Sequence, residues 1–130
     1  FGTPSAGIAA GGRAPSVTAA NESWDGTSWT EVGDLNTARG DASSSKAAPA
    51  TNGLVYIGST GNHTNTQTLT ESWDGTSWAE TSDLSTARYR GGGGGTGSSA
   101  ICATGYDGSS RSSATEEFSI APTTRKATIS

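Results

Sequence analysis

Residues 22–29 read ESWDGTSW, and residues 71–78 repeat this sequence without change. When the comparison is extended to Arg39 and Arg88, the two segments agree at 14 of 18 positions. Their offset of 49 residues lies within the period of about 20–50 residues that is typical of repeat proteins, whose units bury their apolar faces against neighbouring units. The sequence therefore predicts a repeat architecture.

Each copy of this segment contains a strong hairpin signal, the sequence DGTS between its two tryptophans. Asp25 and Asp74 can accept hydrogen bonds from the backbone two residues on, and the glycine that follows can adopt the positive φ that the turn requires. The tryptophans of each copy should then face each other on adjacent strands: Trp24 with Trp29, and Trp73 with Trp78. Because Leu, Ile and Val are scarce, we expect these four side chains to form most of the core.

A short β-rich run precedes each copy of the motif, and the period occurs almost three times. The run LVYI at residues 54–57 is typical of a buried strand, and its counterparts are residues 7–10 and 100–104. After the third run, Phe118 takes the place of the first tryptophan, and the second tryptophan is missing. We predict an all-β chain of three units: residues 1–39, residues 40–88, and a truncated unit with a C-terminal tail at residues 89–130.

A run of five glycines at residues 91–95 occupies the place of the first strand of the third unit. Without side chains, this segment can either pack closely against other backbone or form a flexible connector. We favour a closely packed innermost strand.

Arg39 and Arg88 lie where the chain crosses from one unit to the next. One interpretation pairs each arginine with a glutamate of the repeat, because the planar guanidinium matches the geometry of a carboxylate. The other interpretation leaves both arginines exposed in loops. The sequence does not distinguish the two.

The composition limits the classes of function. The net charge is −4 and there is no basic cluster, so we expect no nucleic-acid partner. No long apolar run is present, so we expect no membrane span. The sequence has one histidine, His63, and one cysteine, Cys102, so we predict no metal site and no cofactor. The apolar residues around Cys102 predict that it is buried.

The repeated segment resembles the kelch repeat. In kelch repeats a glycine pair ends one strand, an acidic-x-aromatic-Asp sequence ends the next, and a tryptophan follows shortly after. Gly11-Gly12, residues 22–25 and Trp29 follow this pattern, with Trp24 where tyrosine is usual. The second copy repeats the pattern, except that Gly58-Ser59 replaces the glycine pair.

This resemblance implies four-stranded sheets arranged as the blades of a β-propeller. Two full repeats and part of a third are too few to close a ring. Further repeats or several chains could complete it, or the repeats could stack in an open arrangement capped by other subunits. The chain begins with Phe1 rather than Met, which indicates a processed or a longer polypeptide.

Among kelch-like proteins, the Thr-, Ser-, Gly- and Ala-rich composition and the DGTSW turns resemble repeats in structural proteins of marine bacteriophages. This narrower resemblance implies a virion protein on the tail or capsid surface. Its partners would be other virion subunits or copies of itself.

We find no pattern that predicts an active site. The segment Ser23-x-Asp25-Gly26 is similar to the Asp-box turn of sialidases but is one residue short, and Asp-boxes are themselves structural turns. We therefore expect no catalytic role for Asp25 or Asp74. His63 stands in its loop without nearby ligand residues, so we expect it to be exposed to solvent.

Three loops vary between the units while the framework repeats, and variable loops on a rigid scaffold are common binding sites. The candidate ligand-binding residues in these loops suit the hydroxyl groups of sugars: Asn62, His63, Asn65, Tyr106 and Asp107. The alternative is that the loops are solvated turns. We therefore expect a non-enzymatic structural or decoration protein of the virion surface. The alternative function is an extracellular module, of a tail fibre or a secreted adhesin, that binds a host surface carbohydrate or receptor.

Overall fold

A computed structural model of the chain describes residues 1–120. These residues form eleven β-strands and no helix, which confirms the all-β prediction for this part of the chain. The strands make three antiparallel sheets, each built from strands that are consecutive in the sequence. The C-terminal tail of the third predicted unit, residues 121–130, lies outside the described residues.

The first sheet has the strand order β1-β2-β3-β4, with bounds Gly2–Thr3, Ala6–Arg13, Val17–Trp24 and Trp29–Val32. The second sheet has the order β5-β6-β7-β8, with bounds Ser43–Ser44, Gly53–Tyr56, Thr70–Trp73 and Trp78–Glu80. The third sheet has the order β11-β10-β9; in chain order, β9 is Gly92–Gly95, β10 is Ser99–Ala103 and β11 is Thr115–Ser119.

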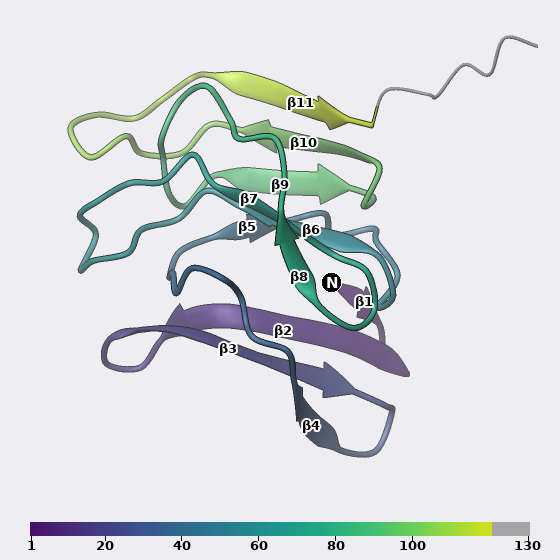
Figure 1. The fold of residues 1–130 in the computed structure, drawn as a ribbon. Coiled ribbons are helices and arrows are strands. Elements are labelled where there is room, and N and C mark those ends of the chain that lie inside the picture. The colour runs from purple at the N-terminus through teal and green to yellow at the C-terminus, as the bar shows by residue number, and fades with distance from the viewer. Residues whose placement is uncertain (121–130) are drawn as a thin grey trace, which may run out of the picture.

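The second sheet lies between the first and the third (Figure 1). One buried apolar cluster joins the first and second sheets: Ile8, Leu35, Val55, Trp73 and Trp78. Another joins the second and third sheets: Leu54, Tyr56, Ile57, Ala100 and Cys102. Each unit thus buries apolar side chains against the next unit, as repeat architectures require.

Each sheet has two distinct faces, because side chains alternate along a strand. We call the face that carries Trp24, Trp73 or Phe118 the front of its sheet, and the opposite face the back. The front of the second sheet packs against the back of the first, where Ile8 lies. The front of the third sheet packs against the back of the second, where Leu54 lies.

The two DGTS hairpins fold as predicted. Trp24 is paired with Trp29 between β3 and β4, and their ring centroids are 5.3 Å apart. Trp73 is paired with Trp78 between β7 and β8, with centroids 5.2 Å apart. In both turns the aspartate Oδ1 accepts hydrogen bonds of 2.8 Å from two backbone N–H groups, and the following glycine has a positive φ.

The prediction that all four tryptophans form the core is wrong for the first sheet. Trp73 and Trp78 are buried, but Trp24 is only half-buried and Trp29 is exposed. The back of the first sheet covers the front of the second, whereas no sheet formed by residues 1–120 covers the front of the first. Identical hairpins therefore differ in burial because their neighbours differ.

The glycine run forms a strand, as we favoured, and this strand pairs with β10. A Cβ atom at Gly93 would lie 2.6 Å from the Tyr56 hydroxyl oxygen and 2.7 Å from the Ser44 carbonyl oxygen. The Tyr56 hydroxyl also accepts a hydrogen bond from the Gly94 N–H at 3.2 Å, and burial raises the pKa of Tyr56 to about 12. The absence of a side chain at Gly93 is therefore what allows the second and third sheets to approach so closely.

The third sheet has three strands in the described part of the chain, and within residues 1–120 no fourth strand pairs with β11. A cleft between the second and third sheets is lined in part by Leu84, Cys102 and Phe118. Phe118 takes the place of Trp73 in the third unit. On the second sheet, Trp78 packs beside Trp73, and the third sheet has no such tryptophan beside Phe118 within residues 1–120. Cys102 is buried, as predicted, and burial raises the pKa of its thiol.

Candidate functional site

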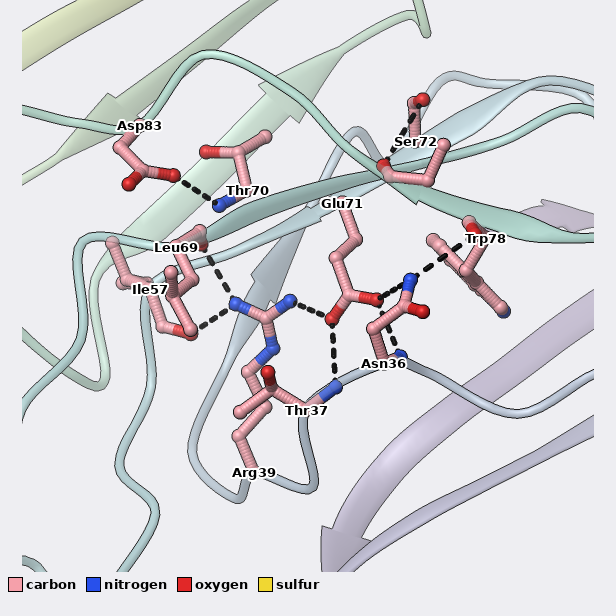
Figure 2. Close-up of polar contacts among 11 residues, drawn as sticks. Asn36, Thr37, Arg39, Ile57, Leu69, Thr70, Glu71, Ser72, Trp78 and Asp83 are labelled. Carbon is pink, nitrogen blue, oxygen red and sulfur yellow. Dashed lines mark hydrogen bonds and ion pairs between the residues drawn. The ribbon is translucent and has the colours of Figure 1, made fainter.

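A buried polar junction joins the first sheet to the second (Figure 2). The Arg39 guanidinium, from the loop after β4, forms an ion pair through Nη2 with Oε2 of Glu71 on β7, and both side chains are fully buried. Arg39 Nη1 also donates to the Leu69 carbonyl oxygen at 2.7 Å. Burying a charge is costly unless the charge is paired and hydrogen-bonded. These contacts therefore allow the guanidinium to lie between the two sheets.

The backbone of the same loop completes the environment of Glu71 (Figure 2). Its Oε1 accepts hydrogen bonds from the Asn36 N–H at 2.6 Å and from Asn36 Nδ2 at 2.9 Å, and its Oε2 accepts one from the Thr37 N–H at 3.4 Å. Burial lowers the pKa of the Arg39 guanidinium, and the charge of Glu71 opposes this effect. The loop thus binds one carboxylate with both main-chain and side-chain donors.

The same kind of junction joins the second sheet to the third. Arg88 Nη2 lies 2.8 Å from Glu116 Oε2, and Arg88 Nη1 donates to the Ala114 carbonyl oxygen at 2.7 Å. Ser85 donates to Glu116 Oε1 from its N–H at 2.6 Å and from its Oγ at 2.7 Å. Burial alone would raise the pKa of Glu116, but the hydrogen bonds from Ser85 and the charge of Arg88 outweigh it and lower the pKa.

The two junctions decide between the two interpretations of the repeat arginines. Arg39 and Arg88 are both buried, and each pairs with a glutamate of the following unit. On the first sheet, Glu22 occupies the position equivalent to Glu71: in both sheets the glutamate lies two residue pairs along the strands from the facing tryptophans. Glu22 is exposed, and it makes no ion pair within residues 1–120.

A second polar cluster surrounds the Asp41 carboxylate in the loops. Its Oδ2 lies 3.5 Å from Arg13 Nη2 and 3.0 Å from His63 Nδ1, and its Oδ1 lies 3.2 Å from Arg90 Nε. Burial alone would raise the pKa of Asp41, but the hydrogen bond and charge of Arg90, together with His63 and Arg13, lower it. The side chain of His63 is 38% exposed, in line with the expected exposure to solvent, but it also contacts this carboxylate, which the sequence did not predict.

Tyr89 connects this cluster to the loop that carries Tyr106. Its ring centroid lies 5.8 Å from that of His63 and 5.5 Å from that of Tyr106, and the Arg90 guanidinium lies 5.7 Å from it. A shallow depression beside these rings is lined in part by Tyr89, Arg90, Tyr106 and Arg111. The structure thus brings two predicted ligand-binding residues, His63 and Tyr106, to one surface.

The other predicted ligand-binding residues are placed differently. Asn62 and Asn65 are exposed, and Asn65 has a positive φ of 53°. The Asp107 carboxylate accepts hydrogen bonds of 2.8 Å from the Ser109 and Ser110 N–H groups. Asp107 therefore makes the same turn as the aspartates of the DGTS hairpins, and its role in the structure is to hold its own loop.

Sequence reasoning missed three members of this surface: Asp41, Tyr89 and Arg90. A signal for them was present where the two copies diverge. After the shared Thr-Ala-Arg, the first copy continues with Gly40-Asp41 and the second with Tyr89-Arg90. In a repeat protein, positions that depart from the repeat beside an invariant framework residue are candidates for a function of their own.

The two junctions offer ion pairs and hydrogen bonds between sheets, and the Asp41 cluster offers charged groups beside aromatic rings. Among residues 1–120, no group of three or more His, Cys, Asp or Glu side chains is arranged to hold a metal ion. The same part of the chain contains no helix that is long and apolar enough to cross a membrane.

Comparisons with protein-family models and with curated proteins find no match for this sequence.

Proposed function

We propose that the chain is a non-enzymatic structural protein of the kelch-like type, whose sheets are blades of a β-propeller. It builds or decorates the surface of a phage particle, with other virion subunits or copies of itself as partners. The observation that supports this proposal best is the repeated junction, in which an arginine of one sheet pairs with a glutamate of the next. Units joined by one recurring contact can be extended by further units of the same kind, which suits an assembly protein.

The packing of the described sheets fits the display of loops. The aspartate turns and paired tryptophans hold each hairpin, and the two apolar clusters hold the sheets to one another. The loops that carry Asp41, His63 and Tyr106 extend from this framework. A rigid framework that presents polar loops can build a particle surface without catalysing any reaction.

The location of the chain tests this proposal. Peptides of the chain should be recovered from phage particles purified by density gradient from lysates of the host that carries the encoding phage. An antibody against the chain should label the tail or capsid surface of these particles in immunogold electron microscopy. Peptides found only in the particle-free fraction of the lysate would contradict a virion role.

A second candidate function, binding of a host surface carbohydrate, has an observation of its own. The rings of His63 and Tyr106 both pack against the ring of Tyr89, a residue that is itself buried, beside the charged groups of Asp41 and Arg90. Ligand sites in proteins commonly combine aromatic surface with a few fixed polar groups. This surface has both in one place.

Titration with the purified surface polysaccharide of the host tests this second function. We expect saturable binding that Tyr106→Ala weakens at least about tenfold, the loss of one well-placed aromatic contact. Trp29→Ala is the matched control, because it removes an exposed aromatic side chain of the first sheet whose ring packs against Trp24. Absence of saturable binding, or equal weakening by both variants, would contradict a glycan site at Tyr106.

A further inference from the structure

We propose that the depression beside Tyr106 binds an acidic sugar, whose carboxylate or sulfate group accepts hydrogen bonds from Arg90 and Arg111. This inference rests on the second function proposed above, binding of a host surface carbohydrate, and names the chemical class of that carbohydrate. It comes from a comparison of equivalent positions in two units and from the distribution of charge over the described residues.

The backbone beside the depression has a counterpart in the second unit. In the third unit, antiparallel bridges join Tyr89 to Tyr106 and Tyr106 to Arg111. The second unit has the same succession of bridges among three small residues: Gly40, Ser59 and Thr66. In both units the first bridge consists of two backbone hydrogen bonds, of 3.0 and 2.9 Å. The same backbone therefore forms with glycine, serine and threonine, so the fold does not require two tyrosines and an arginine here.

Arg90 is specific to its unit in the same way. It lies 49 residues after Asp41, at the same position of the repeat, and the two residues have nearly equal positive φ angles of 56° and 54°. The framework thus accepts a side chain of either charge at this position. The Arg90 side chain is 60% exposed and contacts Asp41 through Nε, and within residues 1–120 its two Nη atoms make no hydrogen bond. These two groups are the donors available to a ligand.

Positive charge is concentrated at the depression. Six of the eight lysine and arginine residues lie within residues 1–120, and the two in the junctions are buried and paired. Two of the other four, Arg90 and Arg111, line the depression, and none of its lining residues in this part of the chain is an aspartate or a glutamate. The cleft between the second and third sheets, in contrast, is lined by Asp83, Glu116 and Glu117. The depression is therefore a local positive site on a chain of net charge −4.

The loop between Tyr106 and Arg111 is held in place at the edge of the depression. The Ser112 N–H donates to the Gly105 carbonyl oxygen at 2.8 Å, and the Tyr106 hydroxyl donates to the Ser109 carbonyl oxygen at 3.0 Å. Arg111 is exposed and makes no ion pair within residues 1–120. A guanidinium on a fixed backbone loses less conformational freedom on binding than one on a mobile loop.

These groups suit a sugar that carries an acid. The parallel N–H groups of a guanidinium match the oxygens of a carboxylate or a similar oxyanion. The half-buried ring of Tyr106 offers apolar surface to the sugar ring, and the hydroxyl groups of Thr104, Ser112 and Ser113 line the same depression. A nucleic acid fits less well, because its regularly spaced phosphates require an extended basic surface. Two arginines on an acidic chain do not provide one.

Isothermal titration calorimetry with the 130-residue chain tests the inference. One pair of probes is tetragalacturonate, which carries carboxylates, and its fully methyl-esterified form, which carries none. The other pair is O-sulfated maltotetraose and plain maltotetraose. At least one acidic probe should bind about tenfold or more tightly than its neutral counterpart, because hydrogen bonds to charged groups are stronger than neutral ones. The acidic probe that binds more tightly shows whether the natural acid is a carboxylate or a sulfate.

Two variants of equal net charge show whether the acid binds at the depression. Arg111→Gln should weaken binding of the acidic probe about tenfold or more, the loss of one charged hydrogen-bonding partner. Lys46→Gln is the matched control, because it removes the same charge from an exposed side chain that does not line the depression. It should change the affinity by less than about twofold. Both replaced side chains are exposed, so both variants should unfold at the same temperature as the unmodified chain.

Three results would overturn the inference: neither acidic probe binds, the neutral probes bind equally well, or the two variants weaken binding equally. A short oligothymidylate that binds as tightly as the acidic probes would also overturn it, in favour of a nucleic-acid site. Titration with the host polysaccharide separates these failures from failure of the proposed function. If the polysaccharide binds and the acidic probes do not, the glycan function stands without an acidic ligand. If only the acidic probes bind, the site stands and the host function fails.

Discussion

At the residue scale, Trp78 and Trp29 occupy equivalent hairpin positions but differ in burial, 7% against 52% exposed. Trp78→Ala should lower the free energy of unfolding by about 3–5 kcal/mol, because it leaves a cavity between two sheets. Trp29→Ala should cost no more than about 1.5 kcal/mol, the value of its contact with Trp24. Urea denaturation monitored by circular dichroism measures both, and equal losses would contradict the stacking of the sheets.

The buried pair of Arg39 and Glu71 gives a second prediction at this scale. Arg39→Met should lower the free energy of unfolding by about 3–5 kcal/mol, because the Glu71 carboxylate would stay buried without its cation. Arg111→Met is the control, since Arg111 is exposed, and we expect a change within about 0.5 kcal/mol. If the two variants unfolded at the same urea concentration, the junction would have no part in stability.

At the element scale, β9 consists entirely of glycine, and its positions are not equivalent. A Cβ atom at Gly93 would clash with Tyr56 and Ser44, whereas at Gly92 its nearest neighbour would be the Ala103 carbonyl oxygen at 3.6 Å. Gly93→Ala should therefore destabilise the protein by about 1–3 kcal/mol. Gly92→Ala should be neutral or stabilise it by up to about 1 kcal/mol, because it restricts the unfolded chain. Thermal unfolding measures the stability of both variants. A lower melting temperature for Gly92→Ala than for Gly93→Ala would contradict this prediction.

Secondary structure at this scale was predictable wherever the signal was local. The DGTS turns and the facing tryptophans follow from residues within one hairpin, whose backbone hydrogen bonds require no other part of the chain. The glycine run was ambiguous, because its packing depends on Tyr56 and Ser44, which are distant in the sequence. Local sequence thus specified the hairpins, and contacts between sheets specified the conformation of the glycines.

At the scale of the whole molecule, carboxylates with lowered pKa values occur in all three units: Asp25, Asp41, Asp74, Asp107 and Glu116. In the three turns, backbone hydrogen bonds are the main cause of the lower pKa. Since the unfolded chain binds protons at higher pH than the folded chain does, stability should be constant near neutrality. It should fall as the pH drops through about 4, the ordinary range of these groups, and towards their lower folded pKa values.

Urea denaturation at a series of pH values measures this dependence. Asp74→Asn, which replaces one titrating carboxylate by an amide that still offers an oxygen acceptor, should make the loss of stability in acid less steep. Stability that rises on acidification would show that these carboxylates are not held in their ionised form by the fold.

The sequence by itself determined the repeat, the all-β class and the two hairpins, because period, turn chemistry and pairing are encoded within a single unit. Only the tertiary structure decided which copies of the repeated residues are buried. Trp78 and Trp29 end the same eight-residue sequence, yet within residues 1–120 only Trp78 has a neighbouring sheet over it. It also decided that the repeat arginines pair with glutamates, and that Asp41, His63 and Tyr89 meet. Burial and long-range contacts depend on which units are neighbours. The sequence of a single unit does not specify its neighbours, so these features arise only when the sheets pack together.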